Sequence, residues 1–165
     1  MKKFILPGLV IMIIIQISLP AYLIIHKYDI LRTGTEYKFK VRPVDPYDAF
    51  RGRYVSLNVN QAVEGYGKYG VITVGKDGYA FVDRATDVKP IKEVYVKSQH
   101  KFRFSLPIDR YYMDEKMAPR AEALTSRSGA GEEAYVTVRI KNGELVVSGL
   151  YIDGIAIEDI ILNNY

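Results

Sequence analysis

The amino-terminal segment of the chain is one uninterrupted apolar run. From Phe4 to Ile25, 22 consecutive positions are uncharged, and Ile, Leu, Val and Met dominate them. An α-helix rises about 1.5 Å per residue, so about 20 apolar residues cross a hydrocarbon core roughly 30 Å thick. The run therefore predicts a membrane-spanning helix, and the rest of the chain must fold beside a bilayer.

A cleaved signal peptide is the competing interpretation of this run. Lys2 and Lys3 followed by apolar residues have the order of the charged and apolar regions of such a peptide. A cleavage site needs small residues two positions apart, and the nearest approach is Ser18-Leu19-Pro20-Ala21, after which apolar residues resume at Tyr22. We therefore expect an uncleaved anchor over residues 1–26 that contacts the membrane through residues 4–25.

The orientation of the anchor follows from charge and from the size of the domain. Lys2 and Lys3 place the amino terminus in the cytoplasm, whereas the basic residues after the span favour the opposite orientation. Long folded domains translocate largely regardless of their charge. We therefore expect a single-pass protein of the cell membrane with an extracytoplasmic carboxy-terminal domain.

Composition excludes several classes of function. The 165 residues leave room for one domain, and the absence of cysteine excludes disulfides, thiolate metal sites and a cysteine nucleophile. The two histidines, His26 and His100, cannot complete a metal-ligand set, so neither a metal nor another cofactor is expected. Without Lys2 and Lys3 the chain has 21 basic and 19 acidic residues, and this balance does not predict nucleic-acid binding.

Beyond the apolar run, the hydrophobic pattern has the period of two that is typical of β-strands. Residues 35–42 alternate without a fault and place Tyr37, Phe39 and Val41 on one face. Shorter alternating runs predict further strands at 54–59, 71–74, 79–82, 93–96, 100–104, 135–140, 144–151 and 155–157.

Turn signals connect these strands. Asp77-Gly78, Asn142-Gly143 and Asp153-Gly154 predict tight turns with positive φ. Pro119 to Leu124 predicts one short helix, because Pro precedes a run of good helix formers.

The predicted fold class is therefore mainly β. A single amino-terminal transmembrane helix (1–26) and a linker (27–34) precede a mostly antiparallel β domain (35–165) with one short helix.

The connection between the first two predicted strands has an unusual composition. Asp45 stands before a proline, which favours an extended backbone, and Asp48 can reach Arg51 across a turn. One interpretation is a rigid loop that displays Asp48, Arg51 and Arg53 to a ligand. The other is a well-built connection between strands.

Residues 43–48, Pro-Val-Asp-Pro-Tyr-Asp, followed by Arg51-Gly52, resemble the GDYXXLXY family of membrane-anchored proteins. The family is named for a Gly-Asp-Tyr-x-x-Leu-x-Tyr motif, and Gly52, Tyr54 and Leu57 match it here.

Two positions depart from the motif, because Arg53 replaces its Asp and Val59 replaces its final Tyr. The resemblance extends to the apolar span, to Arg110-Tyr111-Tyr112 and to residues 149–154. It implies a bacterial membrane-anchored β-rich domain without an established biochemical role, often expected to work with a multi-span membrane protein. It supplies no catalytic residues.

An enzymatic function rests on one cluster of carboxylates. Asp109, Asp114 and Glu115 flank Tyr111 and Tyr112, and paired carboxylates can perform acid–base chemistry in a membrane-bound hydrolase. The structural alternative is a solvated surface loop with ion pairs. The sequence shows neither a Ser-His or Ser-Lys set nor a Gly-rich phosphate loop, which favours a non-enzymatic accessory or binding module.

The expected partner of such a module is a multi-span membrane protein. Tyrosine suits a binding face, because it offers a large contact area at a low entropic cost. The candidate binding residues are Asp45, Asp48, Arg51, Arg53, Tyr54, Tyr111 and Tyr112.

Overall fold

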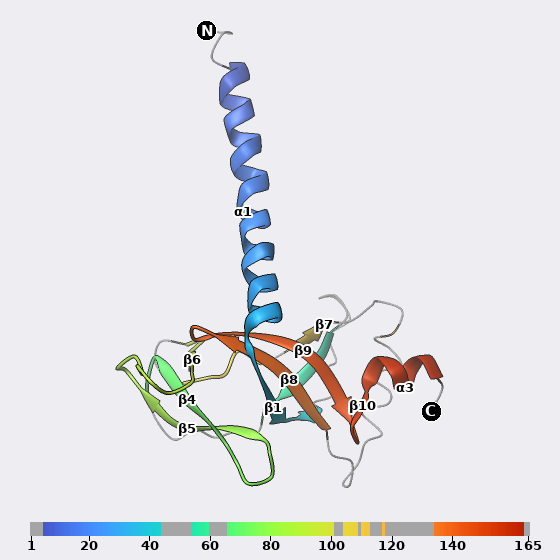
Figure 1. Cartoon of the computed structure of the whole chain (residues 1–165). Helices are drawn as coiled ribbons and strands as arrows, with labels where there is room; N and C mark the ends of the chain where they lie inside the picture. The colour runs from blue at the N-terminus through green and yellow to red at the C-terminus, as the bar shows by residue number, and fades with distance from the viewer. Residues whose placement is uncertain are drawn as a thin grey trace.

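A computed structural model of the chain describes residues 5–43, 54–59, 66–100, 104–108, 110–112, 117 and 134–163. Helix α1 (Ile5–Thr33) projects from a β-rich domain (Figure 1). Its stretch Pro7–Thr33 is long and apolar enough to cross a membrane. The predicted apolar helix is thus present, and it continues through most of the segment 27–34 that was expected to be a linker.

A single residue, Gly34, separates α1 from the first strand, β1 (Thr35–Lys40). The N–H of Gly34 donates to the carbonyl oxygen of Ile30 at 2.8 Å. A Cβ atom at position 34 would lie 2.5 Å from that oxygen and 3.2 Å from the Cβ of Arg139. Glycine therefore permits this tight exit, and the helix enters the sheet without a flexible linker.

The largest sheet has four antiparallel strands in the order β1-β8-β9-β10. Its other strands are β8 (Ala134–Lys141), β9 (Glu144–Ile152) and β10 (Ile155–Ala156). The alternation predicted for residues 35–42 is confirmed, since Phe39 and Val41 are buried while Lys38 and Lys40 are exposed.

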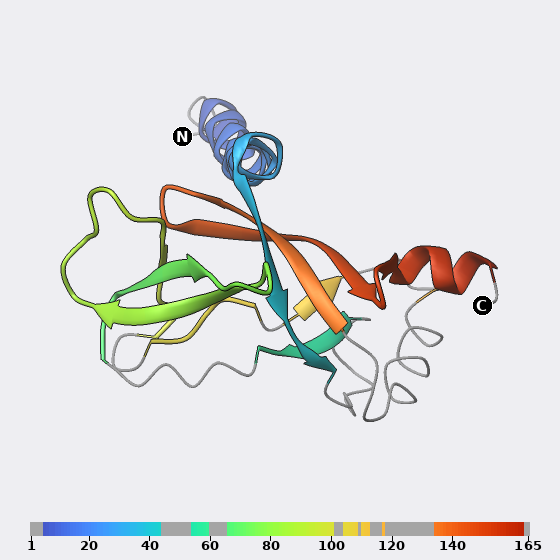
Figure 2. The same ribbon diagram turned by 60° about the horizontal axis from the view of Figure 1, so that its bottom comes forward.

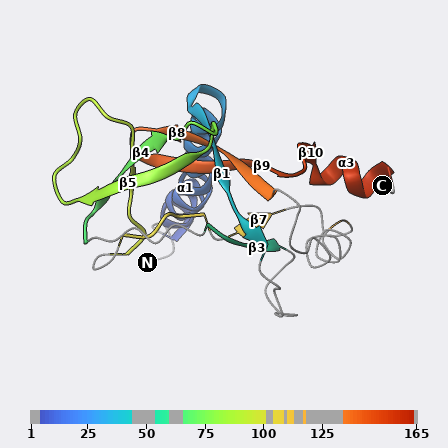
Figure 3. The same cartoon turned by 90° about the horizontal axis from the view of Figure 1, so that it is seen from below.

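Two three-stranded sheets complete the domain. One has the order β2-β3-β7 and consists of β2 (Arg42–Pro43), β3 (Tyr54–Asn58) and β7 (Arg110–Tyr112). The other has the order β5-β4-β6 and consists of β4 (Tyr69–Val74), β5 (Ala80–Thr86) and β6 (Tyr95–Lys97). Figures 2 and 3 show β4 and β5 to one side of β1, and β3 and β7 near the end of β1.

One hydrophobic core joins the large sheet to its neighbours. Phe39, Val136 and Val138 are fully buried at its centre, where β1 pairs with β8. Further buried members come from the β5-β4-β6 sheet, from β9 and from the carboxy-terminal helix: Ile72, Val82, Val96, Leu150, Ile157 and Ile161. The chain thus folds mainly as antiparallel β-structure around a shared core, as predicted.

The three predicted turns are confirmed by their backbone angles. The φ values are 82° at Gly78, 53° and 80° at Asn142 and Gly143, and 49° and 83° at Asp153 and Gly154. Glycine tolerates such angles best, and asparagine and aspartate better than other residues.

Three predicted strands are wrong in part. β6 begins at Tyr95, so Glu93 and Val94 of the strand predicted for 93–96 lie outside it. His100 and Phe104 lie outside any strand, and Phe104 instead fills the core beside Gly70. The strand predicted for 155–157 ends at Ala156, because Ile157 begins helix α3 (Ile157–Asn163). Two acidic residues in its first turn, Glu158 and Asp159, favour this helix.

The segment Arg110–Tyr112, considered above as a surface loop, is strand β7 and pairs with β3. Tertiary pairing stabilises a strand too short to show a local pattern. The helix predicted for Pro119 to Leu124 lies outside the described residues.

Candidate functional site

The structure describes part of the predicted binding segments. Tyr54, Tyr111 and Tyr112 lie on described strands. The remaining candidates lie outside the described residues: Asp45, Asp48, Arg51, Arg53 and the carboxylates Asp109, Asp114 and Glu115.

The two segments that were singled out separately are neighbours in one sheet. In the β3–β7 pairing, Tyr54 lies opposite Tyr112 and Val55 lies opposite Tyr111. β3 is the central strand of this sheet, since it also pairs with β2. The Tyr-x-x-Leu part of the motif therefore forms the strand on which the sheet is built.

The two tyrosines of β7 have different surroundings. Tyr112 is 68% exposed. Tyr111 packs against the core, and its hydroxyl donates to Oε1 of Glu158 on α3 at 2.5 Å. Burial, and then the hydrogen bond and charge of Glu158, raise the pKa of Tyr111 above its usual range. Tyr111 thus ties β7 to α3, whereas the side chain of Tyr112 lies at the surface.

A second set of polar residues lies where α1 meets the large sheet, and we call it the helix–sheet junction. Its members are His26, Lys27, Asp29 and Thr33 on α1, Glu36 on β1, Lys97 on β6, and Arg139, Lys141 and Glu144 on β8 and β9. Sequence reasoning missed this set. The available signal was the spacing of His26, Asp29, Ile30 and Thr33, which places them on one face of a helix.

Lys141 binds the last turns of the helix. Its Nζ atom lies 2.6 Å from Oδ2 of Asp29 and 2.8 Å from Oγ1 of Thr33. Two residues earlier on β8, Arg139 donates to the carbonyl oxygen of Gly34 at 3.1 Å and pairs with Glu36 at 2.7 Å.

Glu144 binds the preceding turn of the helix. Its Oε2 atom lies 3.2 Å from Nε2 of His26 and 3.3 Å from Nζ of Lys27, and its Oε1 atom lies 3.8 Å from Nζ of Lys97. Burial opposes ionisation of Glu144, but the hydrogen bonds and charges of Lys27 and His26 outweigh burial and lower its pKa below the ordinary value.

An apolar contact completes the junction. Ile30 is only 1% exposed, although the helix around it is largely exposed. Each of these ion pairs is partly exposed and contributes little alone, but together with the buried Ile30 they hold α1 against β8 and β9. The junction therefore sets one orientation of the domain relative to the apolar helix.

A tyrosine–lysine cluster covers the far end of the outer face of the large sheet. It consists of Lys38, Lys40, Tyr79, Tyr135 and Tyr151. The rings of Tyr135 and Tyr151 stack with centroids 5.0 Å apart, and Tyr79 meets Tyr135 edge-on at 5.7 Å. Lys38 Nζ lies 5.3 Å from the ring centroid of Tyr135, and Lys40 Nζ lies 4.5 Å from that of Tyr79.

A β-bulge places Tyr151 in this cluster. Thr137 pairs with Gly149 and Val138 with Val147, so Ser148 is an extra residue in β9. Because side chains alternate between the two faces, one extra residue reverses the alternation. Tyr151 consequently lies on the same face as its partner Tyr135. This arrangement depends on pairing between strands, which the alternating pattern alone does not specify.

Within the stretches of chain that the structure describes, no three His, Asp or Glu side chains are grouped so that they could hold a metal ion.

Comparison with known protein families decides where the chain belongs. The GDYXXLXY protein family matches residues 16–150, which is most of the chain. The chain belongs to the GDYXXLXY family. The match begins inside α1 and ends inside β9, so it includes the helix–sheet junction and leaves out β10 and α3. No curated protein and no solved structure matches the chain.

Proposed function

We propose that this GDYXXLXY protein is a single-pass membrane protein whose β domain is an accessory or binding module for a multi-span membrane protein. α1 is the anchor, and the domain lies outside the cytoplasm. The observation that carries the proposal is the helix–sheet junction, in which Lys141 and Glu144 bind successive turns of a helix apolar enough to span a bilayer.

A domain held in this way presents the same surface to every neighbouring membrane protein. Gly34 is the only residue between helix and sheet, so the domain keeps one face toward the bilayer and the others toward its neighbours. Tethering in one membrane raises the effective concentration of a partner to about the millimolar range. A small contact on the domain is then sufficient.

The proposed contact is the exposed side of β7. Tyr112 is an exposed aromatic residue on a strand that pairs with the family motif. Figure 1 shows β7 on the side of the domain from which α1 rises, where a membrane-embedded partner would reach it. Self-association through α1 is less favoured, because its apolar run has an isolated Gly8 and lacks a small-x-x-x-small pattern.

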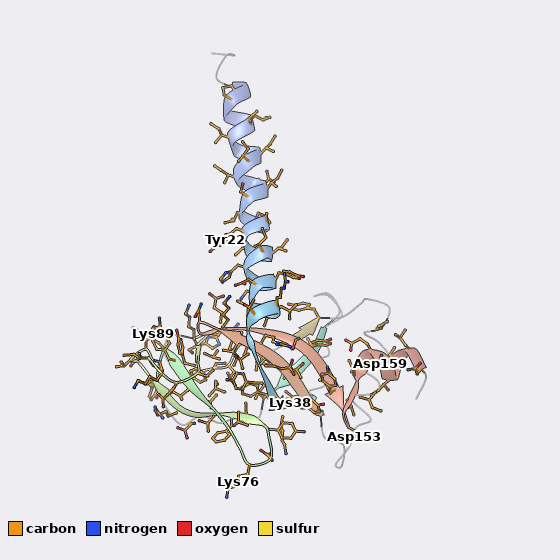
Figure 4. All side chains as sticks on the ribbon, in the orientation of Figure 1. Tyr22, Lys38, Lys76, Lys89, Asp153 and Asp159 are labelled. Atoms are coloured by element: carbon orange, nitrogen blue, oxygen red, sulfur yellow. The ribbon has the colours of Figure 1, made fainter. Side chains whose placement is uncertain are left out.

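Photocross-linking in intact membranes tests the partner. A photoreactive amino acid at Tyr112 is compared with the same amino acid at Lys76, an exposed residue on the opposite side of the domain (Figure 4). We expect an adduct with a multi-span protein from position 112 only. Equal or absent adducts at the two positions contradict the partner contact.

The orientation has a separate test. The chain contains no cysteine, so Lys76→Cys introduces a single thiol in an exposed turn. A membrane-impermeant maleimide should modify this thiol in intact cells. Modification only after the cells are opened would place the domain in the cytoplasm and contradict the proposed topology.

A further inference from the structure

The β5–β6 loop, residues 87–94, carries two aliphatic side chains that face solvent. Ile91 is 97% exposed and Val88 is 76% exposed, more than any other aliphatic residue that the structure describes. Other large aliphatic side chains of the β domain are exposed to a smaller degree, such as Leu162 at 65% and Val74 at 51%. The β5–β6 loop differs because its two most exposed residues lie three positions apart in one short segment. Exposed apolar side chains that lie near one another are candidates for an interaction surface, whereas isolated ones are ordinary.

Local contacts hold this loop in place. Arg84 donates to both carboxylate oxygens of Glu93 at 2.7 and 2.6 Å and so closes the base of the loop. The N–H of Val88 donates to Oγ1 of Thr86 at 3.2 Å, and Pro90 restricts the backbone between the two aliphatic residues. Val88 and Ile91 are therefore presented by a defined loop.

A chain of contacts connects the loop to the end of α1. Lys89 Nζ lies 5.8 Å from the ring centroid of Tyr95, and the ring of Tyr95 lies against Gly143 in the β8–β9 turn. The next residue, Glu144, binds His26 and Lys27 of α1. Figure 4 shows Lys89 on the side of the domain from which α1 rises, and Lys76 on the opposite side.

The same contacts locate the loop relative to a bilayer. The uncharged run of α1 ends at Ile25, and His26 and Lys27 are the first polar groups after it. When the apolar run fills the hydrocarbon core, these two side chains lie at the headgroups, together with Glu144. The β8–β9 turn, and the loop that is connected to it through Tyr95, then lie on the side of the domain that faces the membrane.

The charges of the loop suit an anionic surface. Lys89 and Lys92 flank Ile91, and Glu93 is already paired with Arg84. Asp87 is then the remaining acidic residue of the loop, so its two lysines leave the loop with a net positive charge. Apolar side chains beside lysines are the combination by which proteins enter the boundary between headgroups and acyl chains.

We propose that the β5–β6 loop is a second membrane contact: Val88 and Ile91 enter the headgroup–acyl boundary of the bilayer that α1 crosses, and Lys89 and Lys92 bind anionic lipid headgroups. This inference rests on the proposed anchoring by α1. Because the junction fixes the helix on the sheet, a second contact at the loop also determines the tilt of α1 in the bilayer.

Single-tryptophan fluorescence tests this contact, because the chain has no tryptophan. Three full-length variants, Leu19→Trp, Ile91→Trp and Lys76→Trp, are reconstituted in phosphatidylcholine–phosphatidylglycerol vesicles with or without brominated acyl chains. We expect bromine quenching and blue-shifted emission at positions 19 and 91, and neither at position 76. All three positions are exposed, so the variants should fold alike.

The arms of this experiment separate the two proposals. If the tryptophan at position 19 is quenched but those at positions 91 and 76 are not, the loop contact is overturned and the anchor stands. No quenching at 19 overturns the anchor and the loop contact together. A tryptophan at 91 that is shielded in native membranes but unquenched in pure lipid assigns the loop to a protein partner, against the proposal.

The lysines have their own control. Adding Lys89→Gln and Lys92→Gln to the Ile91→Trp variant should reduce its quenching in anionic vesicles, and replacing phosphatidylglycerol by phosphatidylcholine should do the same. Quenching that neither change affects would overturn the contact of Lys89 and Lys92 with anionic lipid headgroups.

Discussion

The Nζ atom of Lys141 lies 2.6 Å from Oδ2 of Asp29, although 112 residues separate them. This ion pair connects β8 to the penultimate turn of an apolar helix. Glu144 repeats the connection one turn earlier through His26 and Lys27. The end of the domain that meets α1 is therefore organised by pairs between the first and last quarters of the chain.

Lys141→Met should loosen the junction while the β domain stays folded, because the removed ammonium group contacts only α1 side chains in the described hydrogen bonds. Spin labels on Arg32→Cys and Lys76→Cys report the angle between helix and sheet. We expect a broader distance distribution in Lys141→Met. The exposed control Lys68→Met should leave the distribution unchanged, and equal distributions in both variants would contradict a role for Lys141.

Acid should weaken the same junction. Burial opposes ionisation of Glu144, but Lys27 and His26 hold its folded pKa below the ordinary value of 4.5. A depressed pKa means that the stabilisation is complete above about pH 4.5 and is lost as the pH falls through the folded pKa. The spin-label distribution should broaden over that range, and it should change less in Glu144→Gln. The same broadening in both proteins would assign the effect to other carboxylates.

The sequence predicts those features of the fold that depend on neighbouring residues, and it does not predict those that depend on residues far apart in the chain. The alternation in β1 and the turn at Asn142-Gly143 follow from neighbouring residues, and both are confirmed. The bulge at Ser148 and strand β7 depend on pairing with distant strands, so no local pattern specifies them.

The candidate sites show the same division. The resemblance to the GDYXXLXY family identified the two segments that meet as β3 and β7. The junction was missed because a helical face at His26, Asp29 and Thr33 gives no indication of which strands will bind it. Lys141 and Glu144 become its partners only when the β8–β9 hairpin is placed beside α1.

Tyr111→Phe should destabilise the domain by about 1–2 kcal/mol, because it removes a hydrogen bond to a carboxylate in a half-buried site. Urea denaturation of the full-length protein in detergent measures the change, and Tyr66→Phe, at a tyrosine that is 82% exposed, is the control. The raised pKa of Tyr111 adds a pH dependence: its stabilisation is present below the ordinary pKa of 10.0 and is lost as the pH rises through the folded value.

A double-mutant cycle measures the free energy of the Tyr111–Glu158 hydrogen bond separately from the other effects of removing the Tyr111 hydroxyl. If Tyr111 and Glu158 act together, Tyr111→Phe should cost less stability in a Glu158→Gln background than in the wild type. Additive effects of the two substitutions would contradict the proposed tie between β7 and α3.

Gly70→Ala should destabilise the core by about 1–3 kcal/mol, the usual cost of overpacking. A Cβ at position 70 would lie within 2.5 Å of Cε2 of Phe104, whose ring is buried. Thr73→Ala, an exposed change in the same strand, is the matched control. Replacing Phe104 by Leu in the Gly70→Ala variant should recover part of the loss, and no recovery would assign the effect to the backbone of β4.

We expect the mature protein to retain its first 25 residues, and the structure shows which measurement can test this. Cleavage after Ala21 would remove most of the apolar run but leave His26 to Thr33, so the junction and the β domain could persist in a released protein. Folding assays therefore cannot distinguish the two forms, whereas the intact mass of the membrane-extracted protein can. We expect a mass that includes residues 1–25, because small residues two positions apart do not follow the apolar run. A mature terminus at Tyr22 or later would show that α1 is a leader sequence, and it would remove the basis for a fixed domain orientation at the bilayer.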